Sequence, residues 1–209
     1  MINWLSGGLR WVFDQIVAYS GNYGIAIILV TILIRLALLP LTIKQTKSLQ
    51  AMKEIQPKLA EIQRKYKNNP QEMQTHSMKL YQEYKINPLG GCLPMLIQIP
   101  ILWAFLLVLR TLPEDSAAQF LFWNLLQKDP YYVLPVLAMI TQYINTQQTA
   151  TDESQKGMLL VMPLFIGLVG MSLPAGLVLY WVINNCFSIV QQAWIAKMYP
   201  AVPQGGQTK

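Results

Sequence analysis

Residues 157–196 read GMLLVMPLFIGLVGMSLPAGLVLYWVINNCFSIVQQAWIA, a run of 40 positions without a charged side chain. A helix that crosses a bilayer needs about 20 mostly apolar residues, so this run has the length of two crossings. Near its middle, the residues from Ser172 to Gly176 combine proline and glycine, which favour a turn. The run therefore predicts two membrane helices, 157–173 and 176–196, joined by a short connection.

Three other charge-poor segments have the length of a membrane helix, and they lie at 22–43, 89–110 and 130–151. The chain of 209 residues is 53% hydrophobic and 12% charged, about half the charged fraction of a typical soluble domain. These features predict an all-α fold: a polytopic membrane protein with five transmembrane helices in a single membrane-embedded domain. Proline removes a helix hydrogen bond and permits bends, and the expected membrane helices contain Pro40, Pro94, Pro100, Pro135 and Pro163.

The charges of the connecting segments indicate the side of the membrane that each one faces. Residues 44–85 carry nine Lys and Arg against four Glu, whereas residues 111–129 carry one Lys and three acidic residues. Short loops rich in Lys and Arg stay in the cytoplasm. We therefore expect segment 44–88 and the C-terminus in the cytoplasm, and the 111–129 loop and the N-terminus outside.

The cytoplasmic segment 44–88 has the pattern of a helical hairpin. Apolar residues recur every three or four positions from Leu49 to Tyr66 and again from Met73 to Tyr84, with Asn68-Asn69-Pro70 between them. Pro57 should kink or split the first of these helices. The hairpin is either a solvated connector or a basic arm that touches anionic headgroups, the ribosome or a client.

The two ends of the chain have different patterns. In residues 1–21, apolar side chains recur at helical spacing with Arg10 and Asp14 off the apolar stripe, which predicts an interfacial helix on the outer surface. This segment lacks the charged start and cleavage site of a signal peptide. Residues 197–209 are rich in Pro, Gly and Gln and are expected to form a flexible tail.

Arg35 lies inside the first expected helix, about 13 Å from its cytoplasmic end. An ionisable residue at such a depth is costly and is by default a functional hypothesis, the alternative being a side chain that snorkels to the headgroups. Uncharged polar side chains occupy the cytoplasmic halves of the other expected helices; they are Gln98, Gln142, Asn145, Asn184, Asn185 and Ser188. Lipid cannot satisfy amides, so these groups should face one another, water or a client.

Together with Arg35, these polar residues predict a hydrophilic, positively charged substrate groove that is open to the cytoplasm and closed toward the outside. The alternative is that they only form hydrogen bonds between helices, which we favour for Gln191 and Gln192.

Nothing in the sequence supports chemistry on a substrate. Nucleotide-binding and hydrolase glycine motifs are missing, and His76, the one histidine, has no cluster of ligands around it. Cys92 and Cys186 both lie in apolar runs, where they are expected to be small core residues and not a disulfide framework. We therefore expect no catalytic residue, no metal, no cofactor and no enzymatic activity.

Several motifs resemble those of one known family. The run Asn87–Pro94 (NPLGGCLP), followed by Ile97-Gln98-Ile99-Pro100, closely resembles the second-core-span signature of the YidC family of membrane protein insertases. Leu173–Leu177 with Tyr180-Trp181 resembles the turn into that family's last span. Arg35 followed by Pro40-Leu41 resembles its first-span pattern, and the resemblance runs through residues 5–198.

The resemblance implies a membrane insertase and chaperone of the bacterial cytoplasmic (inner) membrane that works without nucleotide hydrolysis, alone or with the Sec translocon. It implies that Arg35 receives hydrophilic, often acidic, stretches of the client, while Ile99 and Pro100 lie on an apolar slide for the client helix. The implied partners are nascent membrane proteins, the lipid bilayer, the Sec translocon and the ribosome, with no directly recognised nucleic acid and no small-molecule substrate. Two departures are the short C-terminal tail and the lack of a large periplasmic domain.

Two other functions compete with insertion. A solute transporter would show an internal repeat and a polar path through both halves of the membrane, and neither is visible in the sequence. A structural assembly factor would use the hairpin to bind partners, with the polar interior being incidental.

The topology can be tested by cysteine labelling. A cysteine introduced at Gln63 or Gln155 should react with membrane-impermeant reagents only from the cytoplasmic side, and one at Ser116 only from outside, because the Lys- and Arg-rich loops stay inside. Labelling of position 63 from outside in sealed cells would contradict the whole topology.

Overall fold

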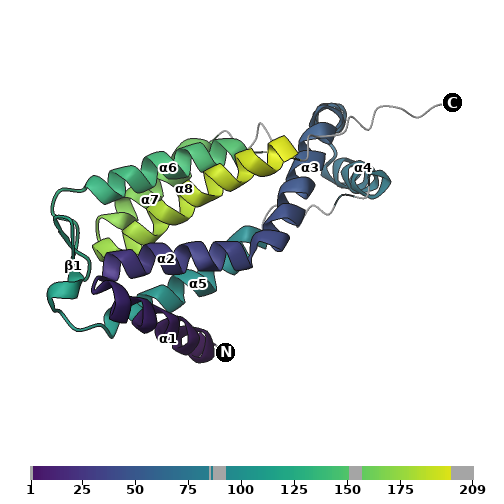
Figure 1. Cartoon of the computed structure of the whole chain (residues 1–209). Helices are drawn as coiled ribbons and strands as arrows, with labels where there is room; N and C mark the ends of the chain where they lie inside the picture. The colour runs from purple at the N-terminus through teal and green to yellow at the C-terminus, as the bar shows by residue number, and fades with distance from the viewer. Residues whose placement is uncertain (1, 85, 87–92, 151–156, 199–209) are drawn as a thin grey trace.

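The computed structural model describes residues 2–84, 86, 93–150 and 157–198, and most of these are helical, as expected. Figure 1 shows a helical bundle with a two-helix arm at one end and a small β-hairpin at the other. The elements are α1 (Ile2–Ser20), α2 (Tyr23–Ala37), α3 (Leu39–Lys65), α4 (Pro70–Glu83), α5 (Leu93–Arg110), η2 (Ser116–Ala118), β1 (Gln119–Phe120), β2 (Trp123–Asn124), α6 (Val133–Thr149), α7 (Met158–Gly170) and α8 (Ala175–Met198).

Helix α8 is the centre of the bundle. It packs against α2, α5 and α6, while α7 packs against α6 and α1 packs against α2 and α5. The rings of Phe105 on α5 and Tyr180 on α8 stack with their centroids 4.3 Å apart, and Ile27 of α2 is completely buried in the same cluster. The bundle is thus held together around α8.

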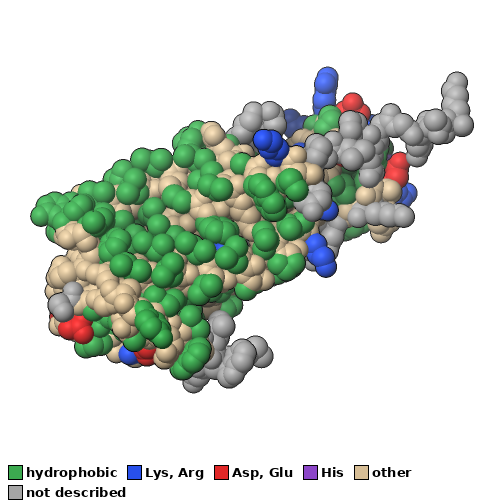
Figure 2. Space-filling view, viewed as in Figure 1, with side chains coloured by type: hydrophobic (Ala, Val, Ile, Leu, Met, Phe, Trp, Pro, Cys, Tyr) green, Lys and Arg blue, Asp and Glu red, His purple; other side chains and the backbone are tan. Residues whose placement is uncertain are grey.

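Hydrophobic side chains cover much of the face of the bundle that Figure 2 shows. Exposed apolar side chains on the described helices include Leu29 and Leu33 on α2, Ile140 and Ile144 on α6, and Leu164, Phe165 and Leu168 on α7. A contiguous apolar surface of this kind marks contact with a membrane or a partner. Within the described residues, no single helix combines the length and hydropathy of a membrane crossing; α2 and α3 do so only as a pair bent by 65°.

The bend between α2 and α3 divides the expected helix 22–43. α2 ends at Ala37 and α3 begins at Leu39, with Pro40 in the first turn of α3. Proline has no N–H for the helix ladder and disfavours helical geometry at the preceding residue, so a change of direction here is inexpensive.

Pro57 was expected to kink or split its helix, and it does not split it. α3 runs continuously from Leu39 to Lys65 with Pro57 inside it. The neighbouring side chains of Ile55 and Leu59 are buried against α4 in the core of the arm. Because packing holds the helix on both sides of the proline, the loss of one backbone hydrogen bond is tolerated.

The arm formed by α3 and α4 confirms the expected helical hairpin. Ile55, Leu59, Leu80 and Ile86 form a small core that is separate from that of the bundle. At the start of α4, the side chain of Asn69 accepts a hydrogen bond from the backbone N–H of Glu72, as an N-cap residue does.

Polar contacts brace the arm within itself and against the bundle. Lys58 donates to the hydroxyl of Tyr84, and this hydrogen bond raises the pKa of Lys58. Lys53 Nζ donates to the backbone carbonyl of Gln148 at 2.6 Å, one of the last carbonyls of α6. A cation at a helix C-terminus is favourable, so Lys53 ties α3 to the end of α6.

Helix α1 confirms the expected amphipathic helix and shows what its apolar stripe contacts. Phe13 is completely buried, and Leu9, Val12 and Ile16 pack on the same core cluster. Off this stripe, Arg10 pairs with Asp14 at 2.8 Å and also donates to the hydroxyl of Thr111, directly after α5, at 2.6 Å. The stripe therefore packs against protein, on α2 and α5.

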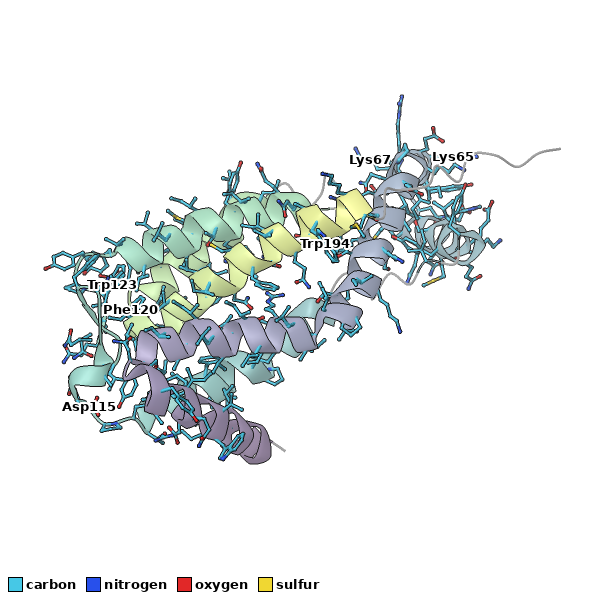
Figure 3. The ribbon with its side chains drawn as sticks, viewed as in Figure 1. Lys65, Lys67, Asp115, Phe120, Trp123 and Trp194 are labelled. Carbon is cyan, nitrogen blue, oxygen red and sulfur yellow. The ribbon has the colours of Figure 1, made fainter. Side chains whose placement is uncertain are left out.

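The β-hairpin closes the end of the bundle opposite the arm (Figures 1 and 3). β1 and β2 pair antiparallel, with Phe120 opposite Trp123. The side chain of Asn22 donates to the carbonyl of Gln119 at 2.6 Å and thereby joins the hairpin to the start of α2. A Cβ atom on Gly24 would lie 2.2 Å from the ring of Phe120, so this contact requires glycine.

The contact at Gly24 generates a stability prediction. Gly24→Ala should lower the free energy of unfolding by about 1–3 kcal/mol, because the added methyl group forces Phe120 and the hairpin apart. The measurement is thermal unfolding of the purified protein in detergent. Gly7→Ala is the matched control: nothing lies within 4 Å of its Cβ, so this variant should be neutral or more stable by up to about 1 kcal/mol. Equal stability of the two variants would contradict the packing described here.

Candidate functional site

Arg35 in the last turn of α2 is held by one asparagine of α8. Its Nε donates to Asn184 Oδ1 at 2.8 Å, and a terminal guanidinium nitrogen donates to the backbone carbonyl of Asn184 at 3.2 Å. In the part of the chain that the structure describes, no carboxylate pairs with Arg35. The half-buried guanidinium is therefore oriented by neutral groups and keeps its charge uncompensated.

The contacts of Arg35 continue across α8 to α5. Asn184 Nδ2 lies 3.5 Å from Gln98 Oε1, at the limit of a hydrogen bond, and Gln98 Nε2 donates to the hydroxyl of Tyr180 at 2.6 Å. Asn184 is 7% exposed and Tyr180 only 1%. We call Arg35, Asn184, Gln98 and Tyr180 the arginine network, and it joins α2, α8 and α5.

A second network lies between α8 and α6. Asn185 Nδ2 donates to Gln142 Oε1 at 3.1 Å, and Asn145 Nδ2 donates to Asn185 Oδ1 at 3.4 Å. Gln192 Nε2 donates to Asn145 Oδ1 at 3.0 Å and to Ser188 Oγ at 3.2 Å. We call this set the amide network. Successive residues point about 100° apart around a helix, which is why Asn184 and Asn185 serve different networks.

The structure thus brings all the predicted polar residues into contacts around α8, but in separate networks and not in one cluster. Most of their side-chain amides form hydrogen bonds to other helices, as the alternative interpretation in terms of interhelical bonding predicts. Whether these residues also receive a client is a proposal.

Gln191 and Gln192, for which hydrogen bonding between helices was favoured, differ from each other. Gln192 makes such bonds, whereas the buried Nε2 and Oε1 of Gln191 have no partner within the described residues. A buried amide without a partner is costly, and Gln191 is only 5% exposed. It lies on the same face of α8 as Asn184 and Ser188, by its spacing along the helix.

Ile99 and Pro100 are exposed on α5, directly after Gln98 of the arginine network. Ile99 is 54% exposed, and Trp103, one turn further on, is 51% exposed. The helix therefore presents an apolar strip to the surroundings next to a polar side chain that faces α8. This placement is compatible with the slide that the family resemblance implies, which stays a proposal.

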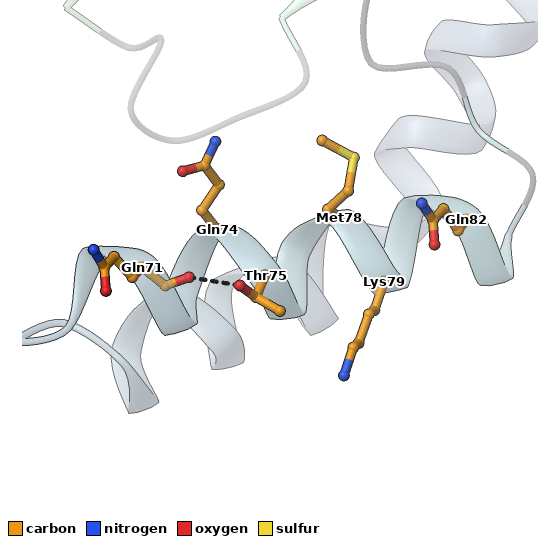
Figure 4. A pocket seen from close by; sticks show the side chains of 6 residues that line it. All are labelled: Gln71, Gln74, Thr75, Met78, Lys79 and Gln82. Atoms are coloured by element: carbon orange, nitrogen blue, oxygen red, sulfur yellow. Dashed lines mark hydrogen bonds between the residues drawn. The ribbon is translucent and has the colours of Figure 1, made fainter.

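A shallow hollow of about 470 Å³ lies on the arm, away from the arginine network (Figure 4). Its lining comes from α4 alone: Gln71, Gln74, Thr75, Met78, Lys79 and Gln82. Thr75 Oγ1 donates to the carbonyl of Gln71 at 2.9 Å, an ordinary contact within a helix. Side chains of one exposed helix do not form a built binding site.

Sequence reasoning missed the role of Tyr180. It was noticed only as part of a family motif, although it lies four residues before Asn184 and therefore on the same helical face. Its ring packs on Phe105 while its hydroxyl meets Gln98. Spacing from Asn184 could have identified it, but a tyrosine in an apolar run has no polar pattern of its own.

The cysteines and the histidine have no shared site. Cys186 is a free thiol and is exposed, so the expectation that it lies in the core was wrong. It directly follows the buried Asn185 on α8. Cys92 lies outside the described residues. The ring of His76 stacks on Tyr66 in the arm at 4.4 Å, and across the described ranges no His, Cys, Asp and Glu gather into a group that could hold a metal.

The fold and these contacts define a class: a helical protein with an apolar outer surface and an arginine held inside it by neutral partners. Comparison with known proteins narrows the class. The sequence model of the family described as "60Kd inner membrane protein" matches residues 15–202. The chain therefore belongs to this family of inner membrane proteins, the YidC membrane protein insertases.

Individual relatives agree with this assignment. The chain is 51% identical over 175 residues to the membrane protein insertase YidC of Caldanaerobacter subterraneus subsp. tengcongensis, covering 83% of this chain and 85% of the relative. It is 43% identical over 199 residues to that of Fusobacterium nucleatum subsp. nucleatum, covering 93% of this chain and 96% of the relative.

A solved structure shares the fold. The crystal structure described as "Active YidC insertase crystal structure with the first transmembrane domain resolved" matches with a TM-score of 0.74 at 32% identity. The match covers 95% of this chain and 46% of that one, so this chain spans about half the length of the crystallised protein.

The arginine network predicts an asymmetry between two tyrosines. Tyr180→Phe should lower the free energy of unfolding by about 1–3 kcal/mol, because the half-buried amide of Gln98 loses its bond to the Tyr180 hydroxyl. Tyr143→Phe is the control: its hydroxyl accepts from Gln147 on the exposed side of α6, so the change should cost less than about 0.5 kcal/mol. The measurement is thermal unfolding in detergent, and equal effects would show that the network adds no stability.

Proposed function

We propose that this insertase receives the hydrophilic segment of a nascent membrane protein at Arg35 and passes the client's apolar helix into lipid along α5. The single observation that carries the proposal is the uncompensated charge of Arg35, which is held in place by the neutral side chain and carbonyl of Asn184. A residue kept charged and oriented without a counter-ion is prepared for an anion from outside the fold.

The chemistry of the guanidinium fits an acidic segment. It stays protonated in proteins and presents a planar set of N–H donors that match a carboxylate. Asn184 uses Nε and one terminal nitrogen of Arg35, which leaves further N–H groups for a client. A carboxylate 4 Å from the guanidinium is attracted by about 1 kcal/mol at the dielectric constant of water and by about 4 kcal/mol at that of a protein surface. An attraction of this size is weak enough for the client to be released.

The driving force in this proposal is burial of apolar surface. At about 25 cal/mol per Å², a client helix of about 20 residues gains enough free energy in lipid to need no nucleotide hydrolysis. Ile99 and Pro100 are apolar and exposed beside Gln98, so a client leaving the arginine network would meet an apolar surface before it meets lipid.

The same proposal includes the orientation in the membrane. The five spans (22–43, 89–110, 130–151, 157–173 and 176–196) form one membrane-embedded core, with the N-terminal helix 1–21 outside. The basic arm 44–88 and the tail 197–209 face the cytoplasm. Lys65 and Lys67 stand at the free end of the arm (Figure 3), where contacts with the ribosome or the Sec translocon would be made.

The test is a paired insertion assay with one client carrying either an acidic or a neutral translocated tail. Arg35→Ala should abolish insertion of the acidic tail and affect the neutral tail much less, since apolar burial drives the latter. Arg35→Lys should retain much of the activity, because the charge is kept while the planar fork is lost. Insertion into liposomes that contain only this protein is the measurement.

Asn184→Asp sharpens the assay. The variant preserves side-chain size but gives Arg35 a carboxylate of its own, which should strengthen their contact and leave thermal stability in detergent unchanged or higher. Insertion of the acidic tail should nevertheless fall by about tenfold, the equivalent of about 1.4 kcal/mol.

Three outcomes would contradict the proposal. Equal losses for both tails in Arg35→Ala would mean that Arg35 supports the fold and does not receive the client. No loss for either tail would leave Arg35 a residue that snorkels to the headgroups. No insertion of any client by the intact protein, with solute flux instead, would favour a transporter.

A further inference from the structure

The β-hairpin at the end opposite the arm carries an uncharged and exposed tip. Residues 116–127 contain no Lys, Arg, Asp or Glu. Leu121 and Phe122 form the turn between β1 and β2 and are 77% and 55% exposed. A turn that stood in water would be expected to hold polar residues and glycine.

The backbone of the turn is strained for the residue that occupies it. Leu121 has φ 56, in the left-handed region, where a leucine costs roughly 1–2 kcal/mol and glycine or asparagine would fit. The exposed side chain of Leu121 gains almost no contact within the protein in return. The cost of this backbone strain is offset only if the Leu121 side chain makes favourable contacts with molecules outside this chain.

The tip continues into other exposed aromatic residues. The ring of Phe122 meets Trp123 at 4.0 Å and the edge of Tyr131 at 5.9 Å. Tyr131 and Tyr132, at the start of α6, are 66% and 50% exposed, and Tyr132 also has φ 56. We call Leu121, Phe122, Tyr131 and Tyr132 the aromatic tip.

The carboxylates of this end of the chain are occupied at the base of the hairpin and not at its tip. Glu114 accepts from the side chains of Asn124 and Gln127, at 3.0 and 2.5 Å. Asp129 is buried and accepts from the backbone N–H groups of Tyr131 and Leu134. The tip can therefore leave water without taking an unpaired charge with it.

The aromatic tip is continuous with the apolar side of α6. Val133 and Val136 are exposed directly beyond Tyr132, and Leu137 and Ile140 extend the same surface. Tyrosine side chains favour the boundary between acyl chains and headgroups, because the ring is apolar and the hydroxyl is polar.

From these observations we propose that the aromatic tip is an interfacial anchor: Leu121 and Phe122 insert among the lipid headgroups and upper acyl chains at the end of the bundle opposite the arm. Tyr131 and Tyr132 lie at the same level with their hydroxyls toward the headgroups. The tip thereby sets how deep this end of the bundle sits in the bilayer. This anchor does not depend on Arg35 or on the client.

Spin labelling in proteoliposomes tests the anchor directly. In a background with Cys92→Ser and Cys186→Ser, a nitroxide is attached after Leu121→Cys or, as a control, after Lys128→Cys; Lys128 is exposed in the segment between β2 and α6. The full chain is reconstituted in vesicles of phosphatidylcholine and phosphatidylglycerol. The label at 121 should collide more with oxygen, which concentrates in acyl chains, and the label at 128 more with a water-soluble nickel chelate.

Two results with these labels would overturn the proposal. If position 121 is as open to the nickel chelate as position 128, the tip stands in water. If position 121 is shielded from both reagents, protein and not lipid covers it.

A second variant separates lipid contact from folding. Leu121→Asn keeps a similar size and suits the left-handed backbone, so thermal unfolding in detergent should occur at the same temperature or higher. A nitroxide attached after Phe122→Cys should then shift from oxygen toward nickel accessibility when Leu121 is replaced. An unchanged immersion of that label would show that the protein fold alone positions the tip, which would overturn an anchoring role for Leu121.

Discussion

The contact between Arg35 and Asn184 is the constraint around which the rest of this molecule is arranged. A guanidinium cannot shed its proton, so a chain that places one inside an apolar bundle must orient it with dipoles or neutralise it with a carboxylate. Here the side chain and the backbone carbonyl of Asn184 hold Arg35 at 2.8 and 3.2 Å. Neutral partners satisfy the hydrogen bonds of Arg35 and leave its charge uncompensated, whereas a structural ion pair would neutralise it.

Because Asn184, the partner of Arg35, lies on α8, this helix is central to the bundle. One of its faces supplies Asn184 and Tyr180 to α2 and α5, and the neighbouring face supplies Asn185 and Gln192 to α6. Apolar residues of α8 such as Leu177 and Val178 are buried further toward the β-hairpin. One helix therefore divides the interior into an apolar half that closes the bundle and a polar half near the arm.

The two ends of the bundle have opposite character because they are built from different residues. The arm has its own small core around Ile55 and Leu59 and carries Lys65 and Lys67 at its end. The other end is closed by backbone contacts, among them Gly176 N–H to the carbonyl of Leu125 at 2.8 Å, and displays the aromatic tip. A charged end and an aromatic end suit a molecule whose depth in a bilayer is controlled from both sides.

The sequence by itself determined the helical class, the hairpin arm, the amphipathic N-terminal helix and the family, because hydrophobic periodicity, turn residues and the motif Asn87–Pro100 are local properties. It also identified the polar residues that would meet, since amides in apolar runs have few places to go. Their division into two networks, the role of Tyr180, the unpartnered Gln191 and the exposure of Cys186 were decided only by the tertiary structure. The same holds for the bend at Leu38 between α2 and α3, and for the unbroken run of α3 through Pro57. Pro40 lies in the first turn of α3, where its missing N–H removes no helix hydrogen bond, whereas Pro57 lies inside α3 and removes one. Around Pro57 the packing of Ile55 and Leu59 in the core of the arm holds the helix together, and such packing is a property of the fold that no local pattern records.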